Sequence, residues 1–396
     1  MNKIVVTGHP YAYSYYFRVF EKMKNKDEMI FVLPRLWLAK KGKVRIKLES
    51  KAGFKIYGLA AASFGGRGIT GLFKGFLPGI FFLLPYLKLK YGSKVLYSCS
   101  EPYLLTTLFN GLMANFCGMK FIFFTWQNVE PKKYLAGFKL KIYSKLIRMN
   151  LNLADGIICG NQKSQEIMKM FTNHDLVSKT LVCPLSGVDV ERFHPGIESD
   201  WRDKLGIKME ERMVLFYGAL DTRKGLEILV DAFKLLIDKN AISNTRLVLV
   251  GTGPEKQNLE SKIKNLELND KITILDWLPN DQLPALLNVV DVFVYPSVPQ
   301  GGWEEQFGYA MAEASACGVP VVATRTGSID EVVVHEKSGL LVQASNPEEL
   351  SKALFRIISD ENMAKEMGKF GREYVVTNFS HPVIAEKIAK FLEGFV

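Results

Sequence analysis

Residues 291–322 have the sequence DVFVYPSVPQGGWEEQFGYAMAEASACGVPVV. The β-branched and aromatic start predicts a strand, the small-residue centre predicts a helix, and the segment after Cys317-Gly318 predicts a second strand. Strand, loop, helix, turn and strand in this order form the repeating unit of a parallel α/β sheet. Ligands of such sheets bind beyond the carboxyl ends of the strands. The polar residues that follow Ser297 are therefore candidates for a binding site.

Two glutamates in this stretch, Glu305 and Glu313, lie eight residues apart. On one helix their side chains would be about 80° apart around the axis and about 12 Å apart along it. Glu305 would stand at the helix entrance, with Glu313 two turns deeper on much the same side. The backbone N–H groups of Phe307 and Gly308 would open toward the same space, where a phosphate group binds well. For such a pair taken alone, the alternative is two solvated helix residues.

This stretch resembles the core signature of the retaining glycosyltransferases of family four, often called group 1. That signature has two glutamates separated by seven residues, Phe-Gly between them, and a small-residue helix that ends in Cys-Gly-x-Pro-Val-Val. The resemblance implies that Glu305 faces the donor sugar. It also implies that Glu313 holds the ribose hydroxyls of the nucleotide.

Further segments between Ser186 and Phe379 match the same family in the same order. They are Gly187-Val188-Asp189 with Phe193 and Pro195, Val214 to Gly218, Arg223 to Leu226, Leu247 to Pro254, Ile274 to Pro279, and Gly327, Glu331 and Gly339 to Val342. The resemblance implies that Arg223 and Lys224, near the turn at Gly218, bind the donor diphosphate. It also implies that the backbone at Trp277 and Leu278 borders the nucleotide base.

The chain departs from the family pattern at three positions. Ala219 stands where many members have an arginine, so the diphosphate contact would rest more heavily on Arg223 and Lys224. Thr326 replaces the first residue of a common glycine pair. Gln127 occupies the place of a histidine at the donor sugar, and its amide can hydrogen-bond a hydroxyl but cannot exchange a proton near neutral pH.

The expected fold class is α/β, with two facing Rossmann-like parallel-sheet domains in the GT-B arrangement that the family implies. Strands are predicted at 3–8, 94–99, 120–125 and 156–159, and again at 213–218, 246–250, 272–275, 291–295 and 320–323. The predicted domains are an acceptor-side, membrane-facing domain over 1–186, joined by a terminal helix over 380–396, and a donor-binding domain over 187–379. Gly8 and His9, after the first strand, are candidates to line the cleft, although His9 is as readily an ordinary loop residue.

Composition limits the classes of protein. The chain has 396 residues, 48% of them apolar, and five cysteines without metal or redox spacing, which favours a folded protein in a reducing compartment. The first residues run directly into a strand and do not resemble a signal peptide. The histidines do not cluster, so no metal site and no cofactor are predicted. The expected location is cytoplasmic.

Charge is divided unevenly along the chain. Residues 1–148 contain 25 Lys plus Arg and 6 Asp plus Glu, a net charge of +19, and the remainder carries −9. The basic half predicts an anionic partner. No nucleic-acid recognition module is visible, so a membrane surface is favoured over nucleic acid.

Three basic and aromatic segments carry this membrane prediction, over 33–55, 69–91 and 132–148. The apolar run from Gly75 to Leu87 is too short to span a bilayer, and two interpretations stay open, a buried core helix or an interfacial insertion. The lysines expected at the membrane are Lys40, Lys41, Lys43, Lys47, Lys74, Lys132 and Lys133.

The sequence therefore predicts a retaining, metal-independent glycosyltransferase that uses a UDP-sugar or GDP-sugar and a lipid or lipid-linked acceptor. A catalytically silent, membrane-bound relative and an enzyme with a soluble acceptor are the alternatives. A nicotinamide dehydrogenase, suggested by Gly251-Thr252-Gly253, is rejected because Lys256 occupies the position of the third glycine.

Overall fold

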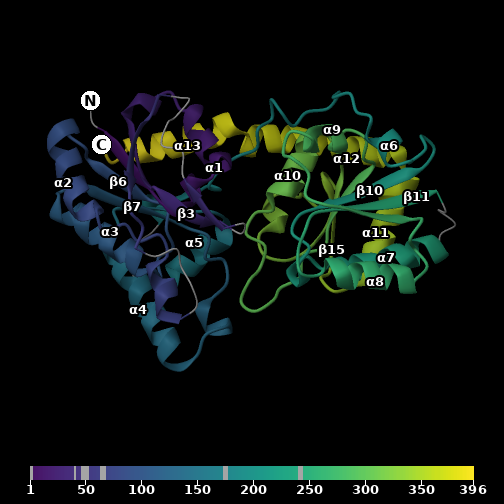
Figure 1. The fold of residues 1–396 in the computed structure, drawn as a ribbon, viewed down its shortest axis with the longest axis horizontal. Helices are drawn as coiled ribbons and strands as arrows, with labels where there is room; N and C mark the ends of the chain where they lie inside the picture. Colours follow the sequence, from purple (N-terminus) through teal and green to yellow (C-terminus); the bar gives the residue numbers. More distant parts are fainter. Residues whose placement is uncertain (1–2, 40–41, 46–52, 63–67, 173–176, 240–243) are drawn as a thin grey trace. The chain divides into compact units, whose positions relative to one another are not determined.

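The structure is a computed structural model, and it describes residues 3–39, 42–45, 53–62, 68–172, 177–239 and 244–396. The chain divides into two compact units (Figure 1). The first comprises Met1–Gly187 together with His381–Val396, and the second comprises Val188–Ser380.

The first domain is built on a seven-stranded sheet in the order β5-β2-β1-β6-β7-β8-β9, with every neighbouring pair parallel. The strands are β1 (Ile4–Thr7), β2 (Met29–Pro34), β5 (Lys55–Leu59), β6 (Val95–Ser98), β7 (Lys120–Thr125), β8 (Gly156–Cys159) and β9 (Thr180–Val182). The helices are α1 (Ser14–Glu21), α2 (Ile80–Tyr91), α3 (Leu105–Phe116), α4 (Gly137–Leu153), α5 (Gln162–Lys169) and α13 (His381–Glu393). A separate antiparallel hairpin joins β3 (Leu36–Ala39) to β4 (Gly42–Arg45).

The second domain has a six-stranded parallel sheet in the order β12-β11-β10-β13-β14-β15. Its strands are β10 (Arg212–Tyr217), β11 (Thr245–Val250), β12 (Ile272–Leu275), β13 (Val292–Tyr295), β14 (Val321–Thr324) and β15 (Gly339–Val342). Its helices are α6 (Trp201–Lys204), α7 (Leu226–Lys239), α8 (Lys256–Asn265), α9 (Leu283–Leu287), α10 (Tyr309–Ala316), α11 (Pro347–Ser359) and α12 (Glu361–Phe379).

The α/β class with two parallel sheets is confirmed, and the nine predicted strands are all present to within a residue or two. These strands could be predicted from continuous apolar runs in the sequence. A strand that is covered by helices on both faces has no solvent-facing side, so polar and apolar residues do not alternate along it. β2 has the same character, with all six residues buried, and was missed. β5 was missed because it is an edge strand whose residues are only partly buried.

Each sheet has one point at which the strand order reverses. In the first sheet the chain goes from β1 to β2 on one side and continues from β6 on the other. In the second sheet β10 is followed outward by β11 and β12, and the chain returns on the opposite side at β13. Connections leave such a pair of strands in opposite directions and open a crevice at their carboxyl ends, where α/β proteins bind ligands. We therefore expect ligands to bind at the loops after β1 and β6, and at those after β10 and β13.

Candidate functional site

The loop after β10 presents two basic residues in the short 3-10 helix η6 (Thr222–Lys224). The side chain of Asp221 caps this turn by accepting a hydrogen bond of 3.1 Å from the backbone N–H of Arg223. The guanidinium of Arg223 donates to the same carboxylate at 2.7 Å. Its centre also lies 4.6 Å from the ring centroid of Trp303. Arg223 is thus held by an anion and an aromatic face at the sheet edge.

Lys224 and Glu305 form a buried ion pair at the same edge. The Nζ atom of Lys224 lies 2.6 Å from Oε2 of Glu305 and 2.5 Å from the hydroxyl of Tyr295, at the end of β13. The hydroxyl of Ser297 lies 3.3 Å from the same carboxylate oxygen. Lys224 is 9% exposed and Glu305 is 7% exposed. Charges that are this well buried need partners of opposite charge. Lys224 and Glu305 are each other's partner.

The loops after β10 and β13 approach each other closely at Gly225. Gly225 follows η6 with φ 62°, in the left-handed region. A Cβ atom there would lie 2.1 Å from the carbonyl oxygen of Pro296, just after β13. Only a residue without a side chain allows this approach, and the approach is what carries Lys224 to Glu305.

The expectation that Glu305 stands at a helix entrance was wrong. α10 begins at Tyr309, after Gly308, which has φ 79° in the left-handed region. Glu305 therefore lies in the loop before the helix, and the helical angle predicted between Glu305 and Glu313 does not apply. The periodicity of the sequence could not locate the start of α10, because that start depends on the backbone conformation of Gly308.

A contact from the next loop fixes the position of Glu305. Gly327, after β14, has φ 58°, and a Cβ atom there would lie 1.9 Å from the carbonyl oxygen of Glu305. The N–H of Ser328 donates to that oxygen at 2.9 Å, and the N–H of Gly327 donates to the carboxylate of Glu304 at 3.2 Å. Gly327, the second residue of the altered glycine pair, is thus required for the close packing of the loop that carries Glu305.

Glu313 lies inside α10 and is 7% exposed. Its carboxylate accepts a hydrogen bond from the hydroxyl of Tyr217, the last residue of β10. Glu313 therefore lies near the end of β10, whereas Glu305 lies near the end of β13. The two carboxylates have separate partners, which supports separate roles.

The other residues predicted in this domain have different environments. Phe307 is 3% exposed, and its ring packs against Tyr309 and Phe379, with centroids 4.8 and 5.1 Å apart. It is a core residue, and only its backbone N–H remains to contribute to a site. Trp277 is 54% exposed and Leu278 is half-buried, both after the edge strand β12. The structure thus leaves the ring of Trp277 largely open to solvent.

Gln127 follows β7 in the first domain and is 9% exposed. Its side-chain nitrogen donates to the carbonyl oxygen of Val129 and, at 3.0 Å, to the hydroxyl of Tyr134. These bonds hold its own loop, so the amide nitrogen is already occupied. Only the side-chain oxygen is left to meet a sugar hydroxyl.

Gly8 and His9 follow β1 as predicted. Gly8 has φ 144°, and a Cβ atom there would lie 2.5 Å from the carbonyl oxygen of Cys99, after β6. The ring of His9 stacks on Trp37 with centroids 5.1 Å apart. The pKa of His9 is lowered to about 3, first by burial and then by the charge of Lys74. His9 is therefore neutral at physiological pH.

The lysines predicted at a membrane fall in different places. Lys40, Lys41 and Lys47 lie outside the described residues, and Lys43 lies in β4. Lys132 and Lys133 are exposed in a short 3-10 turn, and Nζ of Lys132 lies 2.7 Å from Glu130. Lys74 lies instead beside His9 and Glu101, at the carboxyl edge of the first sheet.

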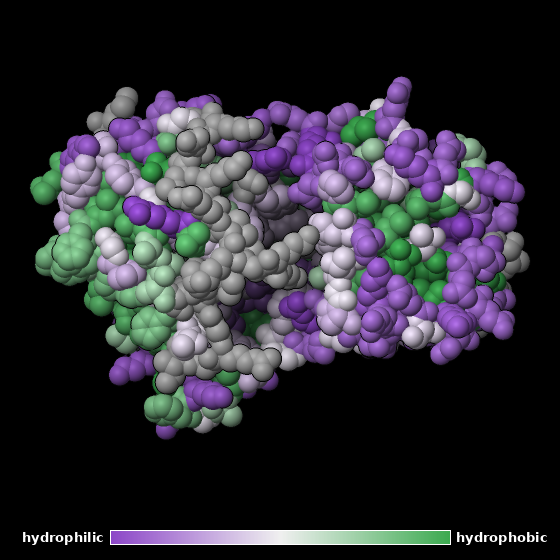
Figure 2. Space-filling model, in the orientation of Figure 1, coloured by the Kyte–Doolittle hydropathy of each residue, from purple (hydrophilic) through white to green (hydrophobic). Residues whose placement is uncertain are grey.

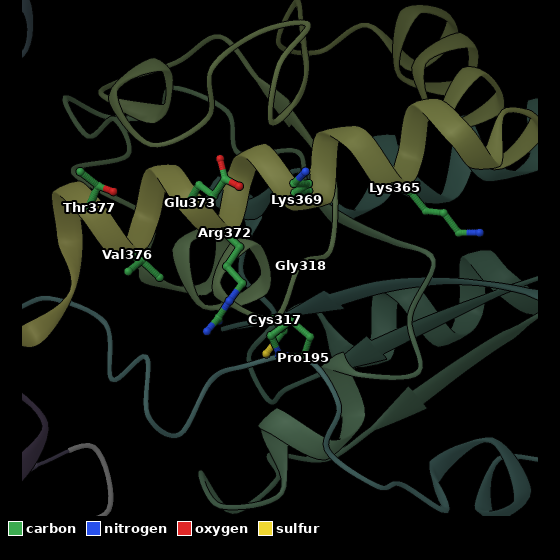
Figure 3. A pocket seen from close by; sticks show the side chains of 9 residues that line it. All are labelled: Pro195, Cys317, Gly318, Lys365, Lys369, Arg372, Glu373, Val376 and Thr377. Atoms are coloured by element: carbon green, nitrogen blue, oxygen red, sulfur yellow. The ribbon is translucent and has the colours of Figure 1, made fainter.

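A hollow of about 600 Å³ lies elsewhere in the second domain, beside α12 (Figure 3). Arg372 points from α12 toward Cys317 and Pro195, and it donates to the carbonyl oxygen of Ala316 at the end of α10. It therefore caps the negative end of that helix. Cys317 and Gly318 precede β14, so this hollow lies at the amino edge of the sheet and includes no predicted site residue.

Several polar residues of the site were not predicted. Tyr295 and Ser297 contact the ion pair from the end of β13, Asp221 and Trp303 hold Arg223, and Tyr217 holds Glu313. Their position at strand ends was the available signal. Among the described residues, no group of three or more His, Cys, Asp or Glu side chains is placed to hold a metal ion.

Residues 198–374, most of the second domain, match the family model for glycosyl transferases group 1. The second domain belongs to the group 1 glycosyltransferases. This confirms the family that the paired glutamates and the accompanying motifs indicated.

Curated relatives support the same assignment. The chain is 33% identical over 211 residues to a GDP-mannose-dependent α-(1-6)-phosphatidylinositol monomannoside mannosyltransferase of Mycobacterium tuberculosis, covering 52% of this chain and 54% of the relative. It is 30% identical over 237 residues to a D-inositol 3-phosphate glycosyltransferase of Corynebacterium jeikeium, covering 58% and 55%. The matches thus span about half the length of these relatives.

Solved structures show that the likeness in fold extends further. Anabaena HepE in complex with UDP superposes with a TM-score of 0.76 at 18% identity, over 100% of both chains. Sucrose-phosphate synthase from Thermosynechococcus elongatus has a TM-score of 0.74 at 21% identity, over 100% of this chain and 99% of that one. Together with the two parallel sheets, these likenesses confirm the GT-B fold class.

Proposed function

We propose that this protein is a retaining glycosyltransferase that moves a sugar from a nucleotide-sugar donor to a membrane-associated acceptor, without a metal ion. The observation that carries the proposal is the buried Lys224–Glu305 pair at the β10/β13 switch point, inside a domain of the glycosyltransferase family. A cation and a carboxylate held this rigidly are ready to contact a diphosphate and a sugar hydroxyl without reorganising.

The proposed roles follow from charge. Departure of a nucleoside diphosphate concentrates negative charge on its β-phosphate. Lys224, Arg223 and the amino end of α10 would offset this charge, because fixed donors stabilise a developing anion most strongly where water is excluded. Glu305 would accept hydrogen bonds from the donor sugar, and Glu313, near the end of β10, would accept them from the ribose.

In the proposed reaction the bond between the anomeric carbon and the β-phosphate oxygen breaks with both electrons leaving on the phosphate. An acceptor hydroxyl forms the new bond from the same face of the sugar, and its proton passes to a phosphate oxygen. This route needs no protein nucleophile, which agrees with the role of Glu305 as one half of an ion pair.

The donor is proposed to be a UDP-sugar or a GDP-sugar. The Mycobacterium relative is named as GDP-mannose-dependent, and the structure of HepE contains UDP. Thermal-shift screening against UDP, GDP and ADP tests the proposal directly. A nucleotide at about 100 times its dissociation constant should stabilise the protein by about 2.7 kcal/mol.

The proposed membrane contact rests on exposed apolar side chains of α2 and α3. Phe82 and Leu89 on α2 are 77% and 87% exposed, and Phe116 at the end of α3 is 78% exposed. Figure 2 shows hydrophobic side chains gathered over these two helices. Lys88 and Lys90 stand in the last turn of α2. Apolar side chains edged by lysines suit the interface of an anionic bilayer.

The run from Gly75 to Leu87 is partly buried and partly exposed. Leu77, Ile80, Leu84 and Leu87 are buried in the core of the first domain, whereas Phe81 and Phe82 are exposed. No helix among the described residues combines the length and the apolar character needed to span a membrane. The proposed attachment is peripheral and on the cytoplasmic face of the membrane, and it rests on the exposed apolar and basic side chains of α2 and α3.

Turnover of UDP- and GDP-sugars by the purified protein, with membrane lipid extract as acceptor, tests the whole proposal. Release of nucleoside diphosphate with a labelled lipid product is the expected result. Nucleotide binding without any turnover would instead identify a catalytically silent relative, and a product in the aqueous phase would identify a soluble acceptor.

A further inference from the structure

The indole ring of Trp303 lies beside both basic residues of η6. The central carbon of the Arg223 guanidinium is 4.6 Å from the ring centroid, and the Nζ atom of Lys224 is 4.9 Å from it. Both distances are within the range of a cation–π contact. One aromatic ring therefore contacts two positive charges at once.

Trp303 is presented by a tight turn that follows β13. The backbone N–H of Gln300 donates to the carbonyl oxygen of Trp303 at 3.0 Å, and the N–H of Trp303 donates back to Gln300 at 2.9 Å. The two central residues, Gly301 and Gly302, have φ 56° and 77°. A two-residue turn of this kind requires left-handed backbone at both positions, which glycine adopts without strain. The turn therefore holds the backbone of Trp303 in one conformation.

The same turn is attached to η6. The hydroxyl of Thr222 donates to the side-chain oxygen of Gln300 at 2.7 Å. The backbone N–H of Val298 donates to the carbonyl oxygen of Arg223 at 2.8 Å. These two bonds join the loop after β10 to the loop after β13, so Trp303 and the two cations belong to one connected group.

Both cations keep N–H groups that a ligand can use. The Nε and Nη2 atoms of Arg223 donate to Asp221, and its Nη1 atom makes no hydrogen bond to any residue that the structure describes. Lys224 donates to Tyr295 and to Glu305. An ammonium group has three donors, so one of them is left. Each cation can therefore donate to a phosphate group without giving up its present partners.

Space filling alone does not account for the position of Trp303. Its side chain is half-buried and lies outside the buried apolar core. Arg223 and Lys224 carry like charges, which repel each other when they stand close together. The negative face of an aromatic ring attracts both charges. The ring therefore favours the arrangement in which the two cations stand side by side.

We propose that Trp303 is a positioning residue that holds Arg223 and Lys224 side by side, and that their arrangement makes the site select a diphosphate over a monophosphate. Lys224 donates to one phosphate group, and Nη1 of Arg223 donates to the other. A monophosphate engages only one of the two cations fully. Trp303 acts through these cations and not on the ligand. This role rests on the proposed function, which assigns both cations to the donor diphosphate.

Calorimetry with UDP and UMP, and with GDP and GMP, tests the proposal through the ratio of the two affinities. The wild-type protein should bind at least one diphosphate more tightly than the matching monophosphate. Trp303→Leu should reduce this preference about tenfold, because both cations lose their contact with the ring. Trp303→Phe keeps an aromatic face and should retain most of the preference.

Trp201→Leu is a matched control in the same domain. Trp201, on α6, also contacts a lysine, since Nζ of Lys204 lies 5.2 Å from its ring centroid. Its replacement should leave the preference for a diphosphate unchanged.

A loss of folded protein would weaken diphosphate and monophosphate binding equally, so the affinity ratio separates positioning from stability. The melting temperature is measured for each variant, and Trp303→Gln, which suits a half-exposed turn, takes the place of Trp303→Leu if the latter does not fold. An unchanged ratio in the folded variant would overturn the role of Trp303 and leave the proposed function standing. Absence of nucleotide binding by the wild type, or equal affinity for diphosphate and monophosphate, would overturn both this role and the proposed use of the two cations.

Discussion

The Nζ atom of Lys224 lies 2.6 Å from Oε2 of Glu305, although the residues are 81 positions apart in the chain. Both side chains are almost fully buried, with Tyr295 as a shared neighbour. Burial raises the pKa of Tyr295 well above its usual value, and the nearby carboxylate of Glu305 adds to this effect. Tyr295 therefore remains a neutral hydrogen-bonding group at physiological pH.

Lys224→Ala should lower turnover about 100-fold or more, by comparison with the loss of other preorganised transition-state donors. It should also destabilise the second domain by about 3 kcal/mol, because removal of Lys224 leaves the buried charge of Glu305 without its partner. The double variant Lys224→Met with Glu305→Gln should recover much of this stability but not the activity. Thermal melts and donor turnover measure the two effects. Full turnover by a folded Lys224→Ala protein would remove Lys224 from the mechanism.

Glu313→Gln should mainly weaken binding of UDP or GDP, because Glu313 is proposed to contact the ribose. Glu305→Gln should retain binding of the free nucleoside diphosphate and impair transfer, because its proposed partner is the sugar. Calorimetry with both nucleotides, followed by turnover, separates the two. Equal losses of nucleotide affinity in both variants would show that the proposed roles are incorrect.

Gly327→Ala should reduce both stability and turnover. Its Cβ atom would overlap the carbonyl oxygen of Glu305 and displace the loop that holds the ion pair. Gly206→Ala is a matched control, since Gly206 has φ 61° and open space around it. That control should show only the strain of the left-handed conformation, about 1–2 kcal/mol, with turnover retained. Similar turnover in the two variants would argue against a role for this contact.

Exposed apolar residues of α2 and α3 should control membrane binding. The triple variant Phe82→Ser, Leu89→Ser and Phe116→Ser should float poorly with anionic vesicles, because it removes the apolar side chains available for insertion. Met209→Ser, which alters an 83% exposed residue of the other domain, should float like the wild type. Equal flotation of the triple variant and the wild type would exclude this face.

Salt dependence tests the electrostatic part of the same proposal. Replacement of Lys40, Lys41, Lys43 and Lys47 by serine should reduce flotation without changing nucleotide affinity. Each basic residue near an anionic surface contributes about 1 kcal/mol, and added salt screens this attraction. Equal flotation with neutral and anionic vesicles would contradict it.

The sequence alone was sufficient to locate nine of the strands and some of the site residues that follow them. Buried parallel strands must be almost wholly apolar, and the glycines and charged residues that interrupt them mark the loops. Gly8 was proposed as a site residue for this reason, whereas Lys224 and Glu305 were proposed because their motifs resemble those of the glycosyltransferase family. β5 escaped prediction because an edge strand is only partly buried and lacks that pattern.

Only the tertiary structure decided which side chains meet. The contact between Lys224 and Glu305 depends on Gly225 passing close to Pro296, and the start of α10 depends on the left-handed Gly308. The polar cluster of His9, Lys74 and Glu101 depends likewise on β1 and β6 being neighbours. Composition and periodicity indicate which segments are buried. The contacts between these side chains depend instead on the order of the strands in the sheet and on how closely the loops approach one another. Those are set by packing between residues distant in the chain.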